Sequence, residues 1–325
     1  MLLGNASELQ NILGSLSLQC GFIQASAGMY SIREQLDYLK LIPHGTKLYF
    51  ATHYNVPLFY SGRMLVTVYD MMHLAMPKFV QGYHKRLYAR LMFAAVRLKA
   101  ESVLTISEFT KNEMYRLLGE FSQPITPILL GVGNEWFSIP RMPSLHPRPF
   151  FLCVGNIKPH KNLKLLVKAF ITIADRVPHD LVLVGKKEGF IHGDQEVAML
   201  AKSFPGRIYF TGRVPDVDLH QYFCHADALI FPSLYEGFGL PPLEAMAAGC
   251  PVVVSNAGPL REVCGDAALY FNPYDESDLS EKLLRIIHDI ELQGALRNRG
   301  YERAKTFTWE RCVSQTCDVI EKLLE

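Results

Sequence analysis

The sequence lacks both a long apolar run and an excess of charge of either sign. No stretch reaches the roughly 18 consecutive apolar residues that a membrane-spanning helix needs, and 33 Lys and Arg residues stand against 32 Asp and Glu residues, for a formal net charge of +1. A nearly neutral chain has no general attraction to nucleic acid. We therefore expect no nucleic-acid partner. The N-terminus lacks the basic and apolar segments of a signal peptide, so we expect a cytoplasmic location.

Several common site motifs are missing as well. The seven cysteines contain no C-x-x-C pair and no spacing typical of a metal site, and most lie in apolar stretches, which indicates core thiols in a reducing compartment. No G-x-G-x-x-G follows a predicted strand, and no G-K-[ST] occurs. These absences exclude a dinucleotide-binding fingerprint and a P-loop.

Short apolar runs alternate with helical patterns along both halves of the chain. With 325 residues and 49% hydrophobic composition, the chain is long enough to bury two cores. Strands are predicted at 21–26, 47–51, 64–69, 102–107 and 125–130, and then at 150–155, 181–185, 208–211, 228–231, 251–255 and 268–271. Helices are predicted between them, among others at 32–39, 80–100 and 108–118. This alternation predicts an α/β fold with doubly wound parallel sheets.

A proline-punctuated stretch separates the two halves. Pro140, Pro143, Pro147 and Pro149 interrupt any helical pattern, as expected of a linker between domains. We predict an N-terminal domain over residues 1–145, a second domain over 146–306 and a terminal helix over 307–325.

The most informative stretch is 232–255, PSLYEGFGLPPLEAMAAGCPVVVS. It predicts a glycine-bearing turn, a helix that begins at two prolines, and a following strand. Free N–H groups at a helix start bind anions, and glycines let the backbone approach a ligand closely. Glu236 and Glu244 bracket the turn. Each acid alone could be a solvated loop residue or a partner of the helix dipole, but together they fit a ligand with both a diphosphate and hydroxyls, such as a nucleoside diphosphate sugar.

Glu236, seven residues and Glu244, inside EGFGLPPLEAMAAGCPVV, resemble the E-x7-E signature of retaining family-4 (group 1) glycosyltransferases with the GT-B fold. The resemblance extends from about Thr46 to the C-terminus and is strongest from 150 to 273. It implies two Rossmann-like domains that face each other across a cleft. It also implies metal-independent transfer of a hexose from a nucleoside diphosphate sugar to an acceptor hydroxyl, with retention.

The chain is most similar to mannosyltransferase-like enzymes of surface polysaccharide and lipopolysaccharide assembly. This resemblance implies GDP-mannose as a first guess for the donor and a glycan or a lipid-linked molecule as the acceptor. Two alternatives stay open. One is another GT-B enzyme, such as a sugar-nucleotide epimerase or a phosphorylase, and the other is a non-catalytic sugar-nucleotide-binding protein.

The resemblance also implies roles on the donor side. Lys161 matches the lysine of the family's V-G-x-x-x-x-x-K-N pattern, in which Gly155 is the glycine and the lysine binds the diphosphate. Asn156 stands where many members have arginine. Lys158 or Arg213 could compensate for that missing cation. A lysine at a predicted helix start is itself unfavourable unless an anion binds there. The resemblance also implies that Glu236 binds the donor sugar or stabilises the charge that develops on it, and that Glu244 binds the ribose. The base is expected near Arg213 and Val214. The diphosphate is expected at the backbone of Gly237, Phe238, Gly239 and Leu240.

On the acceptor side, the family has a T-x-H-D segment whose histidine lies near the transferred sugar. This chain has Tyr69 before Asp70. His53, after the preceding strand, and His73, one turn further on, are the histidines that could take the role. We place His53 and Asp70 with Glu236 and Lys161 among the catalytic residues, although Asp70 could equally cap a helix.

Three further expectations concern single segments. Residues 1–20 offer no strand followed by a glycine-rich loop, so the first βα unit of the family is expected to be missing. Asp216-Val-Asp218 spells the D-x-D metal motif of another glycosyltransferase fold, but Asp216 is predicted to cap a helix, and we expect no metal. Residues 309–324 are expected to form a helix that returns to the N-terminal domain, with Trp309 as a packing anchor.

The segment 80–99 is rich in basic residues and has no acid, since none occurs between Asp70 and Glu101. A basic amphipathic helix of this kind can lie on an anionic membrane, here the inner face of the plasma membrane. It is equally typical of an ordinary helix that covers a sheet. The basic residues are Lys85, Arg86, Arg90, Arg97 and Lys99.

Overall fold

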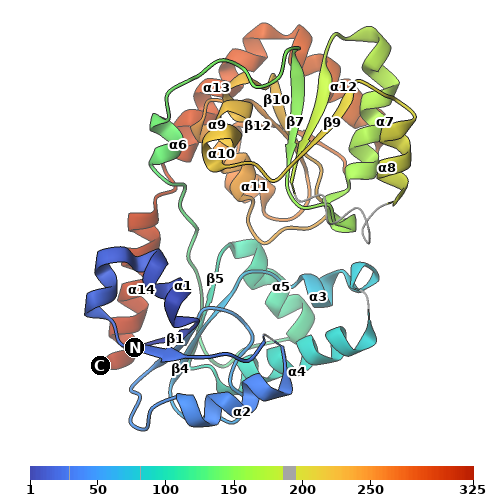
Figure 1. The fold of residues 1–325 in the computed structure, drawn as a ribbon. Helices are drawn as coiled ribbons and strands as arrows, with labels where there is room; N and C mark the ends of the chain where they lie inside the picture. Colours follow the sequence, from blue (N-terminus) through green and yellow to red (C-terminus); the bar gives the residue numbers. More distant parts are fainter. Residues whose placement is uncertain (29, 81, 186–194) are drawn as a thin grey trace.

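The computed structural model describes residues 1–28, 30–80, 82–185 and 195–325. Within these ranges the strands form three parallel sheets, with the orders β1-β2, β3-β4-β5-β6 and β12-β11-β10-β7-β8-β9 (Figure 1). The strands are β1 Leu2–Gly4, β2 Phe22–Gln24, β3 Tyr49–Ala51, β4 Met64–Val68, β5 Ser102–Thr105, β6 Ile125–Pro127, β7 Phe150–Val154, β8 Asp180–Val184, β9 Ile208–Gly212, β10 Ala228–Phe231, β11 Val252–Ser255 and β12 Ala268–Phe271.

Helices connect these strands, and the predicted alternation of strand and helix is confirmed. The α-helices are α1 Ala6–Leu13, α2 Ile32–Leu41, α3 Met72–Ala75, α4 Tyr83–Lys99, α5 Glu108–Leu118, α6 Glu135–Ser138, α7 Leu163–Ile173, α8 Gln195–Lys202, α9 Asp216–His225, α10 Leu240–Ala247, α11 Leu260–Cys264, α12 Glu276–His288, α13 Ile290–Ala304 and α14 Trp309–Leu324. In the described part of the chain, no helix has the length and apolar character to span a membrane.

The six-stranded sheet is covered on both faces. Along β7, Phe150 and Leu152 point into one hydrophobic cluster with α9 and α10, whereas Phe151 and Cys153 point into a second cluster with α7 and α12. Successive side chains of a strand point to opposite faces, so a strand that is apolar at every position is buried on both. This is the doubly wound arrangement that the apolar runs predict.

The four-stranded sheet is also packed on both faces. Met92, Phe93 and Val96 of α4 fill the core on one face. On the other face, Leu65 and Leu104 contact Ile320 and other residues of α14, so the last helix of the chain lies against the sheet of the first half (Figure 1). Trp309 is not the buried anchor that we expected, because 43% of its surface is exposed.

Two segments of the chain run between the halves, and they contact each other. The N–H of Val132 donates a hydrogen bond to the carbonyl of Phe307 (3.0 Å). Gly131 lies so close to the start of α14 that a Cβ there would be 2.2 Å from the backbone nitrogen of Trp309. Directly after this contact, Trp136 enters the core of the second half.

Residues 1–20 differ from the expectation. We expected no strand followed by a glycine-rich loop there, whereas Leu2–Gly4 forms β1, which is followed by α1 and pairs in parallel with β2. Three residues are too few for the period-2 pattern that identifies a strand from sequence. What makes them a strand is the distant partner, since the N–H of Leu2 donates to the carbonyl of Gly21 (2.7 Å).

Candidate active site

Loops after the strands of the two larger sheets meet each other. The N–H of Met71, after β4, donates to the Tyr235 hydroxyl, after β10 (3.3 Å). The Ser107 hydroxyl, after β5, donates to the Gly237 carbonyl (2.7 Å). Ligands of open parallel sheets bind at the carboxyl ends of the strands, and here two such edges are in contact. The segment that the sequence singles out therefore lies between the two halves.

Gly237 is a glycine because of this contact. A Cβ at position 237 would lie 2.0 Å from the Tyr69 carbonyl oxygen and 3.1 Å from the Asp70 Cβ. No side chain fits between two backbones at that separation. The loop that carries Glu236 is thus held directly against the segment that carries Asp70.

Lys161 and Glu236 form an ion pair across the donor-side loops. The distance from Lys161 Nζ to Glu236 Oε1 is 2.6 Å, and the two side chains are only 20% and 16% exposed. The ammonium also lies 5.2 Å from the centre of the Phe231 ring. Seventy-five residues separate the pair in sequence, so the fold brings together the two residues to which the resemblance assigns the diphosphate and the sugar.

The turn that carries Lys161 is a single 3-10 turn, Pro159–Lys161, followed by Asn162 in the left-handed conformation (φ 56°). Its neighbour His160 is buried, and burial, with the two flanking lysines, lowers the pKa of the imidazole to about 4. His160 is therefore neutral near pH 7. Lys158 and Lys161 are left as the cations of this turn.

Glu244 lies in α10 and has an unusual ionisation. Burial, followed by the charges of Asp216 and Glu135, raises the pKa of this carboxyl to about 7. No described side chain donates a hydrogen bond to it. A half-buried acid without a donor is the kind of group that a ligand hydroxyl can satisfy.

Other predicted donor-side residues surround this centre. Gly155 and Asn156 line a small cavity of about 10 Å³ together with Lys161. Arg213 is exposed, whereas Val214 packs against the core of the second half. Of the α10 loop, Phe238 is buried, Gly239 has a φ of 125° and Leu240 begins the helix.

The sequence reasoning missed Ser233, which lines the same small cavity. Its side chain is 1% exposed, and its hydroxyl has no hydrogen-bond partner among the described residues. Its position in the sequence could have indicated this residue, because Ser233 directly follows a buried strand and a proline and stands three residues before Glu236.

On the facing half, His53 is held in one tautomer. Its Nδ1 accepts a hydrogen bond from the Asn55 N–H (3.2 Å), and because a backbone N–H can only donate, the proton of the neutral ring is on Nε2. Burial is the main cause that lowers the pKa of His53. The ring packs on Tyr54 (4.2 Å between centres) and lies 6.4 Å from Tyr69.

Asp70 and His73 lie beside His53. One Asp70 oxygen accepts from the Met72 N–H (2.8 Å), two residues on, while Met71 is the residue that caps the short helix α3. Burial lowers the pKa of His73, and Asp70 opposes this shift, whereas Lys158 of the other half adds to it. The structure therefore places His53, Asp70 and His73 together, with Lys158 near enough to act on His73.

Asp216 begins α9 and does not cap it, since Pro215 is the N-cap. An acid in the first helical turn complements the helix dipole without any cap hydrogen bond. Within the described residues, no group of three or more His, Cys, Asp or Glu side chains is arranged to hold a metal ion.

The two facing sheets and the loops between them define a GT-B glycosyltransferase fold, and the chain belongs to the family of glycosyl transferases group 1, whose pattern matches residues 136–303. It is 31% identical over 304 residues to the O-antigen chain mannosyltransferase B of Escherichia coli, covering 88% of this chain and 76% of that protein. It is 29% identical over 247 residues to the O-antigen chain mannosyltransferase RfbU of Salmonella typhimurium, covering 76% of this chain and 67% of that protein.

Solved structures share the fold at lower identity. The sucrose-phosphate synthase of Thermosynechococcus elongatus superposes with a TM-score of 0.76 at 22% identity, over 94% of this chain and 84% of that chain. Anabaena Alr3699/HepE, solved in complex with UDP and glucose, superposes with a TM-score of 0.77 at 15% identity, over 97% of this chain and 89% of that chain.

Proposed function

We propose that this glycosyltransferase moves a hexose from a nucleoside diphosphate sugar to an acceptor hydroxyl, with retention, in the assembly of a surface polysaccharide. The observation that carries the proposal is the Lys161–Glu236 pair (2.6 Å), because Glu236 belongs to the loop that is held against Asp70 of the other half. The O-antigen mannosyltransferases among the relatives support a polysaccharide acceptor and make GDP-mannose the first donor to test.

In this mechanism the leaving diphosphate is the group that needs stabilisation. Lys161 and the free N–H groups of residues 237–240 supply positive potential as the bond from C1 to phosphate breaks. Lys161 lies against Glu236, so the diphosphate would share the ammonium with this carboxylate. Glu236 then holds the donor sugar and stabilises positive charge on the anomeric carbon.

The remaining roles follow from position and protonation. Glu244, when ionised, accepts hydrogen bonds from the ribose hydroxyls, and the base lies near Arg213 and Val214. On the facing half, His53 offers its Nε2–H as a hydrogen-bond donor to a sugar oxygen. Asp70 has a second carboxylate oxygen with which to orient the acceptor hydroxyl.

The division into domains is part of this proposal. Separate cores under the four-stranded and six-stranded sheets support two domains, with α14 returning to the first. Because Trp136 lies in the second core, the second domain would begin before residue 146.

An anionic membrane surface is a proposed partner of α4. Leu87, Leu91 and Leu98 are 55%, 52% and 83% exposed, and their spacing of four and seven residues places them on one side of the helix. Arg90 is exposed next to them on the helix, and Lys85 is exposed in the first turn of α4. Apolar side chains flanked by cations are the combination that binds the headgroup region, which would place the enzyme at the inner face of the plasma membrane.

The central test is the removal of each member of the ion pair. We expect Lys161→Ala and Glu236→Ala each to lower kcat/KM by roughly 100-fold, about 2.7 kcal/mol of transition-state stabilisation. Lys164 and Glu196 provide matched controls, since they form another ion pair of 2.6 Å on the surface of the same half, with 43% and 48% exposure. Lys164→Ala and Glu196→Ala should leave turnover unchanged.

Donor identity can be measured separately, by thermal shift with GDP-mannose, UDP-glucose and ADP-glucose and by NMR of the product anomer. Near-normal turnover in either ion-pair variant would refute the assigned roles. Binding of a sugar nucleotide without transfer to any acceptor would favour a non-catalytic binding protein instead.

A further inference from the structure

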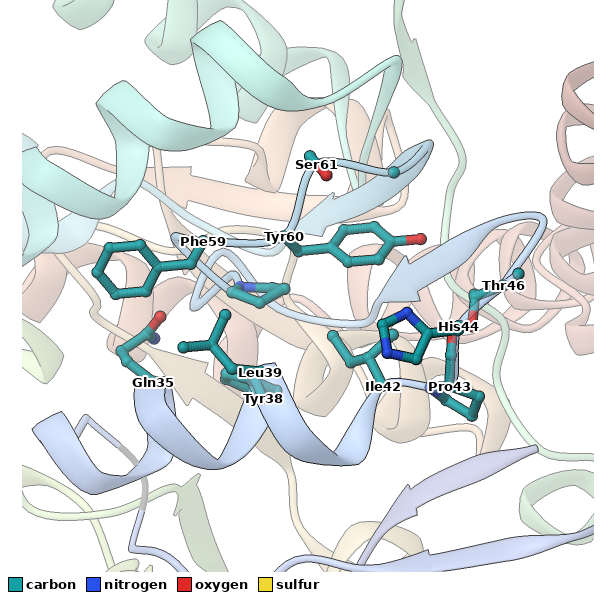
Figure 2. A pocket seen from close by; sticks show the side chains of 13 residues that line it. Gln35, Tyr38, Leu39, Ile42, Pro43, His44, Thr46, Phe59, Tyr60 and Ser61 are labelled. Carbon is teal, nitrogen blue, oxygen red and sulfur yellow. Dashed lines mark hydrogen bonds between the residues drawn. The ribbon is translucent and has the colours of Figure 1, made fainter.

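A pocket of about 290 Å³ lies outside the candidate active site, at the opposite end of β3 and β4. It is formed by the second half of α2, the segment 42–46 that leads into β3, and the segment 57–62 that leads into β4. Figure 2 shows Phe59 and Tyr60 on one side of the pocket and Gln35 and Leu39 of α2 on the other. Strands β3 and β4 begin just after these two segments and end two residues before His53 and Asp70, respectively.

The lining of this pocket is apolar, aromatic and polar, and the imidazole of His44 is its one basic group. Of the thirteen residues that line it, none is a lysine, arginine, aspartate or glutamate. Aromatic rings come from Tyr38, Phe59 and Tyr60, whereas Thr46 and Ser61 contribute hydroxyls. A phosphate or a carboxylate would meet no lysine or arginine in such a pocket and at most the exposed His44, so its chemistry fits a neutral ligand that has both apolar faces and hydroxyl groups.

Tyr60 carries an unused polar group. Its hydroxyl is buried and has no hydrogen-bond partner among the described residues. The ring lies against Gly62, where a Cβ would be 2.3 Å from the hydroxyl oxygen. A buried hydroxyl without a partner is unfavourable, and a ligand hydroxyl that reaches it would remove that cost.

The rim of the pocket exposes apolar surface that the fold does not use. Phe59 is 64% exposed and Leu39 is 54% exposed. Together with the buried hydroxyl, this rim resembles the combination of apolar walls and few polar groups found in small-molecule sites. We propose that the pocket binds an uncharged sugar residue of the glycan acceptor, several units away from the hydroxyl that receives the new hexose.

Two elements connect the pocket with the candidate active site. Glu34, in the first turn of α2, accepts hydrogen bonds from Asn55 Nδ2 (2.9 Å to each oxygen), and the N–H of Asn55 donates to His53. From Glu34 to Ile42 at the pocket, the helix extends about 12 Å. A glycan laid along α2 would thus reach the pocket with an earlier unit while its end lies at His53. This step rests on the proposed function, because it takes the acceptor to be a glycan.

The test is direct binding of neutral oligosaccharides to the full chain without donor. Titration calorimetry with a linear mannotetraose should show binding to the wild type. Phe59→Ala should weaken it about fivefold, as expected for the loss of one aromatic contact. Tyr60→Phe should weaken it as well without lowering the melting temperature, because it removes a hydroxyl that has no partner.

Tyr274→Ala is the matched control, because Tyr274 is 71% exposed on the other half and should leave the affinity unchanged. In transfer assays, KM for the tetrasaccharide should rise in Phe59→Ala, while KM for a monosaccharide acceptor and kcat stay unchanged. The proposal is overturned if mannotetraose does not bind the wild type, or if the wild type and both pocket variants bind it equally.

Failure of the pocket and failure of the proposed function give different results. If the wild type binds the oligosaccharide but transfers no sugar, and the pocket variants bind it more weakly, the pocket is supported and the enzymatic function is not. Transfer that is unaffected in Phe59→Ala for acceptors of every length would keep the enzyme and reject the pocket.

Discussion

At the scale of single residues, Glu244 links the candidate site to pH. Its pKa is raised to about 7, mainly by burial, so the neutral form is favoured in the folded protein. The contribution of this shift to stability is fully present below the ordinary glutamate pKa of about 4.3 and is lost as the pH rises through 7. Above pH 7 the ionised form, which a ribose would need, is held at a cost of about 4 kcal/mol.

We therefore predict that donor binding weakens as the pH falls from 8 to 6, by up to about tenfold per pH unit below the pKa. Glu244→Gln should bind the donor weakly at every pH and should unfold at higher denaturant concentration than the wild type at pH 8. Fluorescence titration of the nucleotide and urea unfolding at pH 6 and pH 8 measure both effects. A pH-independent Kd in the wild type would show that Glu244 does not bind the ribose.

The sequence predicts those site residues that belong to a local pattern, but not those contacts that join distant segments of the chain. Glu236 and Glu244 stand eight positions apart in a recognisable string, so the sequence predicts both. The tautomer of His53 could not be predicted, because it depends on the backbone N–H of Asn55 and on the turn that aims it. The pairing of Lys161 with Glu236 depends on two loops from different strands, which local pattern does not encode.

At the scale of elements, α4 is both a core helix and an exposed basic surface. Arg97 donates to the Leu118 carbonyl (2.7 Å) and Lys99 donates to the Leu58 carbonyl. These two cations are therefore bound within the fold. Lys85 and Arg90 are exposed, and Arg86 lies over the Tyr83 ring (5.6 Å).

We predict that the wild type floats with vesicles that contain phosphatidylglycerol and that the triple variant Lys85→Glu, Arg86→Glu, Arg90→Glu does not. Each cation near an anionic surface contributes about 1 kcal/mol, so the loss should be large at low salt. The triple control Lys202→Glu, Arg285→Glu, Lys322→Glu makes the same charge change at exposed positions elsewhere. Equal flotation of the two triple variants would contradict a role for α4.

Elements with strong local signals could be predicted well. Helix α5 spans Glu108–Leu118, the range that the sequence predicts, because Ser107 caps it and accepts from the Thr110 N–H (3.0 Å). Gly119 follows with a φ of 77°, which ends the helix. Strand β1 has no such local signal, and its existence depends on a partner twenty residues away.

At the scale of the whole molecule, the two halves are joined by more than chain connections. The Glu262 carboxylate, in α11, accepts hydrogen bonds from the N–H groups of Glu108 (2.9 Å) and Phe109 (3.1 Å) at the start of α5. A carboxylate at a helix N-terminus is favoured by the unpaired N–H groups and by the helix dipole. This contact therefore stabilises the arrangement in which the loops of both halves touch.

We predict that Glu262→Ala shifts the protein toward a more open arrangement and lowers kcat about tenfold, since charge-assisted hydrogen bonds are worth about 1.5–3 kcal/mol. Small-angle scattering should show a larger radius of gyration. Glu291→Ala, at an exposed acid of α13, is the control. An unchanged radius and an unchanged kcat would show that Glu262 does not hold the halves together.

The backbone contact of Gly131 and Val132 with the segment 307–309 decides where such motion can occur. Both segments of the chain that connect the halves contact each other there. We therefore expect them to act as one hinge, so that neither connection can extend without the other. The proline-punctuated stretch 140–149 lies beyond this hinge, where Met142 and Pro140 bind Gln221 of α9. We expect any swinging of the halves to turn on these few backbone atoms around a glycine, and not on the loops that carry Lys161 and Glu236.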